Sequence, residues 1–128
     1  MSKEEAVNYW VKSSKLDLET AEDLFKTKHY HYCLFFCHLF VEKIIKALIV
    51  KDTGENPLPI HDLVKLAQGT EIEIPRETVE QLKEITTFNI RARYDNIKLA
   101  FYKKATREYA KKWFLIAKEV YQWLTEKL

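Results

Sequence analysis

The longest apolar stretch of the chain, LFFCHLFVEKIIKALIV, runs from Leu34 to Val50. Its apolar residues lie almost all the way round a helical wheel, a pattern typical of a helix buried in a globular core. At roughly seventeen residues, the stretch is near the lower length of a membrane span. However, Glu42, Lys43 and Lys46 lie in its middle, and a group of charges at bilayer depth is energetically expensive. The stretch therefore predicts the central helix of a globular protein, ending at about Asp52.

The polar residues of this helix are gathered on one side. At 100° per residue, a narrow stripe contains His31, His38, Glu42 and Lys46. Lys43 lies well off the stripe, and we expect it to face solvent. The stripe predicts either a polar seam inside the fold or the wall of a pocket. An ordinary i,i+4 ion pair between Glu42 and Lys46 on a partly exposed face is the alternative.

The N-terminal segment predicts an amphipathic helix to about Lys26. Ser2 and Glu5 form a capping-box pair, so the helix is expected to begin at once. Its inward stripe consists of Val7, Trp10, Val11, Ser14, Leu18, Ala21 and Phe25. Tyr9 and Leu16 lie on the opposite face, where they are candidates for the edge of a dimer contact.

The clearest break in the chain follows the central helix. Residues 52–59, DTGENPLP, are rich in turn-forming types. Residues 60–68 predict a short helix with His61 and Asp62 in its first turn, where an acidic side chain favours the helix dipole. Residues 70–74 alternate like a strand, but the sequence offers no partner strand, so we expect an extended connector.

Polar residues interrupt the apolar stripe of the next predicted helix. Pro75 suits its first position, and its inner face is predicted from Val79, Leu82, Thr86 and Ile90. Continuing this phase puts Asn89 and Arg93 on the inward side, where apolar residues are expected. After Asp95 the phase is lost, which predicts an irregular loop to about Tyr102.

A last amphipathic helix is predicted from Lys103 or Lys104 to the C-terminus. Its core stripe consists of Thr106, Ala110, Trp113, Ala117, Val120, Leu124 and Leu128. The composition of two Gly, three Pro and 31% charged residues is that of a helical protein with few sharp turns. The length of 128 residues suits one core. We predict a single all-α domain over residues 1–128, an up-and-down bundle of four long helices plus one short helix.

Charge and cysteine content add few constraints. The net charge of +2 gives no bulk field that favours nucleic acid, although lysine and arginine are denser after residue 90. Cys33 and Cys37 are four residues apart in the central helix, where a disulfide is geometrically poor. With His38 they are too few for a typical zinc site, so no metal or other cofactor is expected. The charged, amphipathic N-terminus does not resemble a signal peptide, and a cytoplasmic, membrane-free setting is expected.

Two polar seams remain as the candidate site. Its residues are His38, Glu42, Lys46, Asn89, Arg93, Tyr94 and Asp95. A buried Arg needs a carboxylate or phosphate partner, because an unpaired buried charge is strongly destabilising. If the two helices are neighbours, Glu42 is the expected partner of Arg93. Arg is also the side chain best suited to bidentate phosphate recognition.

The order and spacing of several motifs resemble the HEPN domain (higher eukaryotes and prokaryotes nucleotide-binding). They are LFFCHLFVEKIIKAL, IHDLVKL, FNIRARYD and the amphipathic C-terminal helix. The resemblance covers the chain from Tyr9 to Leu128. Its most specific parts are Glu42-Lys43 with Lys46-Ala47-Leu48, His61-Asp62-Leu63 and Arg93-Tyr94-Asp95. It implies a small all-α bundle, commonly dimeric, associated with nucleotides. Some family members pair with a minimal nucleotidyltransferase in toxin–antitoxin-like modules.

Other members of that family are metal-independent endoribonucleases that use an Arg followed, four to six residues on, by a His. The sequence departs from this pattern, because no His occurs after His61. General-base catalysis on RNA needs a group that titrates near neutrality, and His is the usual one. The sequence is closer to a subclass with an Arg-Tyr-Pro-Asp-like segment, although the Pro is missing. We therefore expect Arg93 to bind a phosphate or a partner rather than to catalyse a reaction.

Three functions remain open from the sequence. The first is a homodimeric binding module that holds a nucleotide or RNA, or docks a nucleotidyltransferase partner. The second is a metal-independent ribonuclease with a degenerate site, in which His38 or His61 supplies the base. The third is a structural interaction protein in which both polar seams are satisfied core groups.

Overall fold

The computed structural model describes residues 1–93 and 95–128, without the side chains of residues 95 and 96. Within these ranges the chain forms helices and no strand, which confirms the predicted all-α bundle with four long helices. The helices are α1 (Lys3–Lys26), α2 (Tyr30–Thr53), α3 (Leu63–Ala67), α4 (Arg76–Arg91), α5 (Asp95–Lys104) and α6 (Arg107–Thr125). No helix in the described part of the chain has the length and apolar character needed to cross a membrane.

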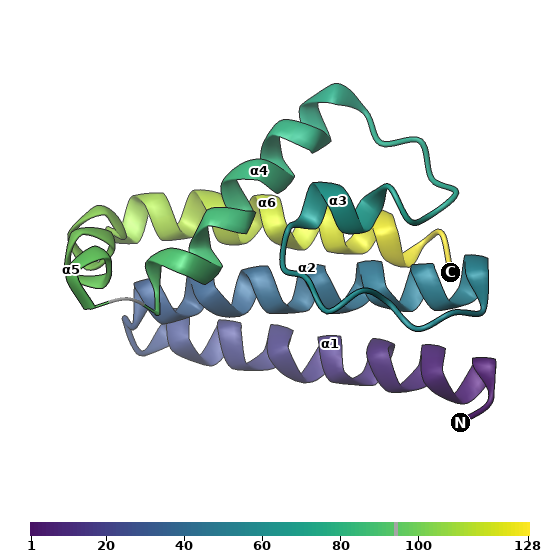
Figure 1. Ribbon diagram of the computed structural model, residues 1–128. Helices are drawn as coiled ribbons and strands as arrows, with labels where there is room; N and C mark the ends of the chain where they lie inside the picture. The colour runs from purple at the N-terminus through teal and green to yellow at the C-terminus, as the bar shows by residue number, and fades with distance from the viewer. Residues whose placement is uncertain (94) are drawn as a thin grey trace.

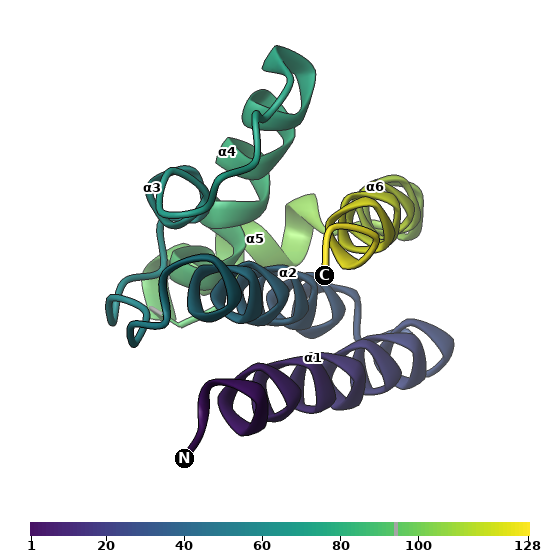
Figure 2. The ribbon, with the colours of Figure 1, turned by 90° about the vertical axis from the view of Figure 1, so that its right-hand side faces the viewer.

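Helix α2 is the centre of the bundle. Figure 2 shows it between α1 on one side and α3, α4 and α6 on the other. Phe40, Val41, Ile44 and Ile45 are completely buried, and each such side chain contributes about 1.5–3 kcal/mol relative to exposure. This packing on both sides explains why the apolar residues of α2 surround the whole helix.

Helix α1 covers one face of α2 in an antiparallel pair (Figure 1). The predicted capping box is present, with the Glu5 amide donating to Ser2 Oγ at 3.1 Å. The prediction for Lys43 was wrong: its Nζ lies 2.6 Å from Asp17 Oδ2 on α1, and both side chains are mostly shielded from solvent. Lys43 therefore joins the two helices instead of facing water.

The C-terminal half differs from the prediction in two places. Residues 95–104 form helix α5 rather than an irregular loop. On α4 the buried side chains are those of Leu82, Ile85, Phe88 and Asn89, whereas Ile90 is half exposed. The predicted inner face of α4 was therefore rotated from the true one, because Phe88 packs inward against Phe101 of α5 with ring centroids 5.8 Å apart.

The connection from α2 to α4 places a loop beside the middle of α2. Gly54 ends α2 in the left-handed conformation (φ 72°), which glycine adopts without steric cost, and its amide donates to the Val50 carbonyl at 2.8 Å. Asp62 is the N-cap of the short helix α3, and its carboxylate accepts from the amides of Val64 and Lys65. Residues 70–74 form the expected extended connector to α4.

Candidate functional site

A buried carboxylate is the centre of the candidate site. Glu42 is only 4% exposed. Its Oε2 lies 3.2 Å from Lys46 Nζ, and its Oε1 accepts from His61 Nδ1 at 2.7 Å. His38 Nε2 lies 3.7 Å from the same Oε1. The i,i+4 spacing of α2 puts three of these side chains on one face, as the sequence predicted. We call His38, Glu42, Lys46 and His61 the Glu42 cluster.

The loop before α3 brings His61 to the cluster and holds it there. The cap formed by Asp62 fixes the start of α3, and the Leu63 amide donates to Thr86 Oγ1 of α4 at 3.2 Å. The His61 carbonyl accepts from His38 Nε2 at 2.9 Å. His61 is thus fixed through its backbone and its ring, yet its side chain is 48% exposed. Its Nε2 has no hydrogen-bond partner among the described residues, so it is available to a ligand.

His38 is a neutral member of the cluster. Burial lowers its pKa below the ordinary value, while the hydrogen bond to the His61 carbonyl and the charge of Glu42 oppose this shift without cancelling it. Because Nε2 donates to that carbonyl, the neutral ring carries its lone pair on Nδ1, a buried atom without a partner in the described structure. His38 therefore positions the His61 backbone rather than supplying charge.

Lys46 is enclosed by α1. Its Nζ lies 5.3 Å from the centre of the Trp10 ring, a cation–π contact, and its side chain is only 9% exposed. The charge of Lys46 is thus balanced by Glu42 on one side and the Trp10 ring on the other. Within the Glu42 cluster, the group that an incoming anion can reach is therefore the exposed side of the His61 ring.

The predicted ion pair between Glu42 and Arg93 is not present. Arg93 is exposed, and its guanidinium lies over the ring of Phe35, 5.3 Å from the centroid. The reason is local: α4 ends at Arg91, so its helical phase does not continue to Arg93. Arg93 still lies near enough to the Glu42 cluster for its charge to lower the pKa of His38.

The other predicted site residues have mixed outcomes. Asn89 is buried as expected, and its Oδ1 has no hydrogen-bond partner in the described structure. Tyr94 lies outside the described residues, as does the side chain of Asp95. Among the residues that the structure describes, no three His, Cys, Asp or Glu side chains are placed to hold a metal ion.

Sequence reasoning placed His61 in the first turn of a short helix and named it as a possible base of a degenerate ribonuclease, and it did not place Trp10 or Phe35 in the site. The available signal for His61 was its place in the segment His61-Asp62-Leu63, one of the most specific parts of the resemblance to the HEPN domain. The structure adds that Glu42 selects the donor nitrogen of His61. A carboxylate that orients an imidazole in this way is a recurring arrangement in sites that bind anions or transfer protons.

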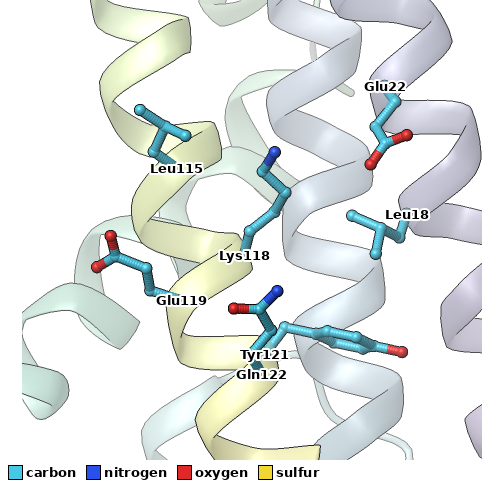
Figure 3. Close-up of a pocket in the computed structure, with 7 residues that line it drawn as sticks. All are labelled: Leu18, Glu22, Leu115, Lys118, Glu119, Tyr121 and Gln122. Atoms are coloured by element: carbon cyan, nitrogen blue, oxygen red, sulfur yellow. The ribbon is translucent and has the colours of Figure 1, made fainter.

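A groove of about 370 Å³ between α1 and α6 is distinct from this cluster (Figure 3). Its polar side chains come from both helices and include Glu22, Lys118 and Glu119. Figure 3 shows the Tyr121 ring directed from α6 toward α1, where its hydroxyl lies 2.9 Å from Ser14 Oγ. The groove shares no lining residue with the Glu42 cluster. Because its lining has charges of both signs, it favours neither an anionic nor a cationic ligand.

Comparisons with known proteins agree with this architecture. No curated protein matches the sequence. Among solved structures, the fold is similar to that of TT1696 from Thermus thermophilus, with a TM-score of 0.83 and 20% identity over 95% of this chain and 98% of that one. The model of the HEPN domain matches residues 7–128. Because the match includes almost the whole bundle and the Glu42 cluster within it, the chain belongs to the HEPN domain family.

Proposed function

We propose that the protein is a HEPN-type binding module in which the Glu42 cluster and Arg93 hold the phosphate of a nucleotide-like ligand. The observation that carries the proposal is the fixed orientation of His61, whose ring is held by Glu42 at 2.7 Å while its other nitrogen faces outward. Arg93 is an exposed guanidinium near the same cluster. An imidazolium, which donates from Nε2 while Nδ1 donates to Glu42, and an exposed guanidinium are suited to charge-assisted hydrogen bonds with phosphate oxygens.

The charge balance supports this reading over a merely structural one. Glu42 and Lys46 neutralise each other inside the bundle. A structural role would be complete with that pair, and would not require a half-exposed His61 to be held by two hydrogen bonds, one to its ring and one to its carbonyl. Arg93 also stacks on Phe35 without a carboxylate partner among the described residues, which leaves its hydrogen-bond donors available. The positive charge that faces outward beside the neutralised cluster is therefore that of Arg93.

Calorimetric titration with ATP, GTP and a short RNA tests this proposal. Arg93→Ala is expected to weaken nucleotide binding about tenfold or more, because charge-assisted hydrogen bonds contribute about 1.5–3 kcal/mol. Arg76→Ala is the matched control, since Arg76 is an exposed arginine at the other end of α4. Tight nucleotide binding that Arg93→Ala leaves unchanged would remove the proposed site.

In the cell, we propose that the module pairs with a minimal nucleotidyltransferase in a toxin–antitoxin-like system and acts as a homodimer. Such a partner would bring the nucleotide to the exposed face that carries Arg93 and His61. Co-purification with a nucleotidyltransferase encoded beside this chain, and light scattering of the protein alone, test the two assemblies. A monomeric protein that does not bind such a neighbour at micromolar concentration would contradict this part of the proposal.

A second candidate function is metal-independent RNA cleavage, and the orientation of His61 is the observation that favours it. With Nδ1 bonded to Glu42, Nε2 is the outward nitrogen and has the geometry of a general base. Labelled RNA incubated with the protein in EDTA should then be cleaved, and His61→Asn and Arg93→Ala should each abolish cleavage. Cleavage that persists in both variants would exclude this site as its source.

A further inference from the structure

A second pocket lies at the end of the bundle where α1 turns into α2 and α5 meets α6 (Figure 1). Its volume is about 300 Å³. It is lined by Lys28, Tyr30, His31, Tyr102, Lys103, Ala105 and Thr106, and we call it the terminal pocket. Along α2, its residue His31 is about 16 Å from Glu42, so the pocket is separate from the Glu42 cluster.

The charged groups of the terminal pocket are cationic. Among the described residues that line it, two are lysines and none has a carboxylate. It also contains the first residue of α2, a long helix whose N-cap, His29, makes no side-chain hydrogen bond to the first turn. The amides of that turn therefore keep their donors and the positive end of the helix dipole. Helix α6 begins at the same pocket, directly after Thr106.

His31 supplies independent evidence that the pocket is built for a ligand. It is only 7% exposed, and its ring packs against Tyr32 and Tyr102 with centroids 4.0 and 5.1 Å away. Despite this burial, its ring nitrogens have no hydrogen-bond partner among the described residues. These nitrogens are not among the fully buried unpartnered atoms of the described structure, so they remain accessible from the pocket. An anion there would accept the hydrogen bond that no described protein group accepts from His31.

An exposed aromatic ring lies beside these donors. Tyr102 is 62% exposed, although its ring is in a T-shaped contact with that of His31. The pocket is wider than a phosphate needs, and an exposed tyrosine next to lysines is a typical platform for stacking a planar ring on one side of a bound phosphate. The terminal pocket therefore combines phosphate donors with a stacking surface.

We propose that the terminal pocket binds the terminal phosphate of a phosphorylated ring compound, either a nucleoside monophosphate or the 5′ end of an RNA. Lys28, Lys103 and His31 contact the phosphate, and the ring stacks on Tyr102. This site involves no residue of the Glu42 cluster, so the proposal does not depend on the function proposed above.

Calorimetric titrations with inorganic phosphate, AMP, and a short RNA with and without a 5′ phosphate test the proposal. Lys28→Gly and Lys103→Ala should each weaken AMP binding about tenfold. Lys28→Gly should leave the fold intact, because Lys28 has the left-handed φ of 66° that glycine adopts freely. Lys111→Ala is the control, since it removes an exposed lysine from α6 outside the pocket.

Further results separate the parts of the proposal. Tyr102→Ala should weaken the binding of AMP to the terminal pocket but not that of inorganic phosphate. Arg93→Ala should leave unchanged the part of AMP binding that depends on Lys28 and Lys103, which distinguishes this site from the Glu42 cluster. The RNA with a 5′ phosphate should bind more tightly than the RNA without one. Equal binding of the two RNAs would exclude the 5′ end of an RNA as the source of the phosphate. The proposal is overturned if neither AMP nor the RNA with a 5′ phosphate binds at millimolar concentration, or if Lys28→Gly and Lys103→Ala have no effect on the binding.

Discussion

Replacing Glu42 by Gln should destabilise the protein substantially, because it leaves the ammonium of Lys46 buried without a counter-charge. At their separation of 3.2 Å, the two charges attract by about 5 kcal/mol in an effective dielectric of about 20. Desolvation offsets part of this attraction, but loss of one partner of a buried pair costs about 3–5 kcal/mol. The Trp10 ring and the remaining exposure of Lys46 place the expected loss near the lower value, about 3 kcal/mol.

The assay is urea and thermal unfolding followed by circular dichroism. For a chain of 128 residues, the unfolding entropy is about 0.27 kcal/mol/K, so a loss of about 3 kcal/mol lowers Tm by roughly 11 °C. Glu80→Gln is the matched control, because Glu80 and Lys83 are 3.1 Å apart but both exposed. That pair should contribute less than about 1 kcal/mol.

A double-mutant cycle identifies the cause of the loss. Adding Lys46→Met to Glu42→Gln removes the unpaired charge and should restore at least about 1 kcal/mol. The reasoning would be refuted if Glu42→Gln lay within about 1 kcal/mol of the natural protein, or if the two substitutions were additive. Either result would mean that Lys46 reaches solvent easily and that the cluster is not a closed charge pair.

Three further predictions concern single groups. Burial lowers the pKa of His38 from 6.5. Its contribution to stability is therefore complete above about pH 6.5 and is lost as the pH falls. In His38→Gln, the urea concentration at the unfolding midpoint should decrease less as the solution is acidified. The pKa of Tyr109 is raised to about 12 by burial and by the Glu84 charge, so ultraviolet titration should show it ionising late, and stability should fall above about pH 10 unless Tyr109→Phe is present. Asp62→Ala removes the cap of α3 that holds His61 in place, and should lower the urea-derived unfolding free energy by about 1 kcal/mol.

The parts of the fold that follow helical periodicity could be predicted from the sequence. The capping pair of Ser2 and Glu5, and the apolar residues that lie all round α2, were sufficient to predict the first two helices. Helix α5 was missed because Ile97 and Leu99 are exposed while Phe101 is buried, so its apolar residues do not mark an inner face. The packing partner of Phe101 is Phe88 of α4, and no local pattern reveals a contact between two helices.

The candidate site was predictable only along α2. The stripe of Glu42 and Lys46 needs nothing beyond the helical repeat, and the structure brings the two charges together. Arg93 was placed inside because the phase of α4 was extended past its end, whereas the helix stops at Arg91. His61 reaches Glu42 through a loop that has no period, so its role as the closest partner of the carboxylate depended on the tertiary fold.

The hydrogen bond between Ser14 of α1 and Tyr121 of α6 joins residues 107 positions apart, and Phe40 of α2 packs against the same tyrosine with ring centroids 5.4 Å apart. During translation, α1 and α2 leave the ribosome well before α6 is made. Until α6 is made, the nascent chain therefore exposes the face of the strongly apolar helix α2 that α6 covers, although α1, α3 and α4 can already pack against the rest of it. A fragment that ends before α6 would therefore be prone to aggregation and would be bound by chaperones or degraded by proteases, rather than forming a smaller stable protein.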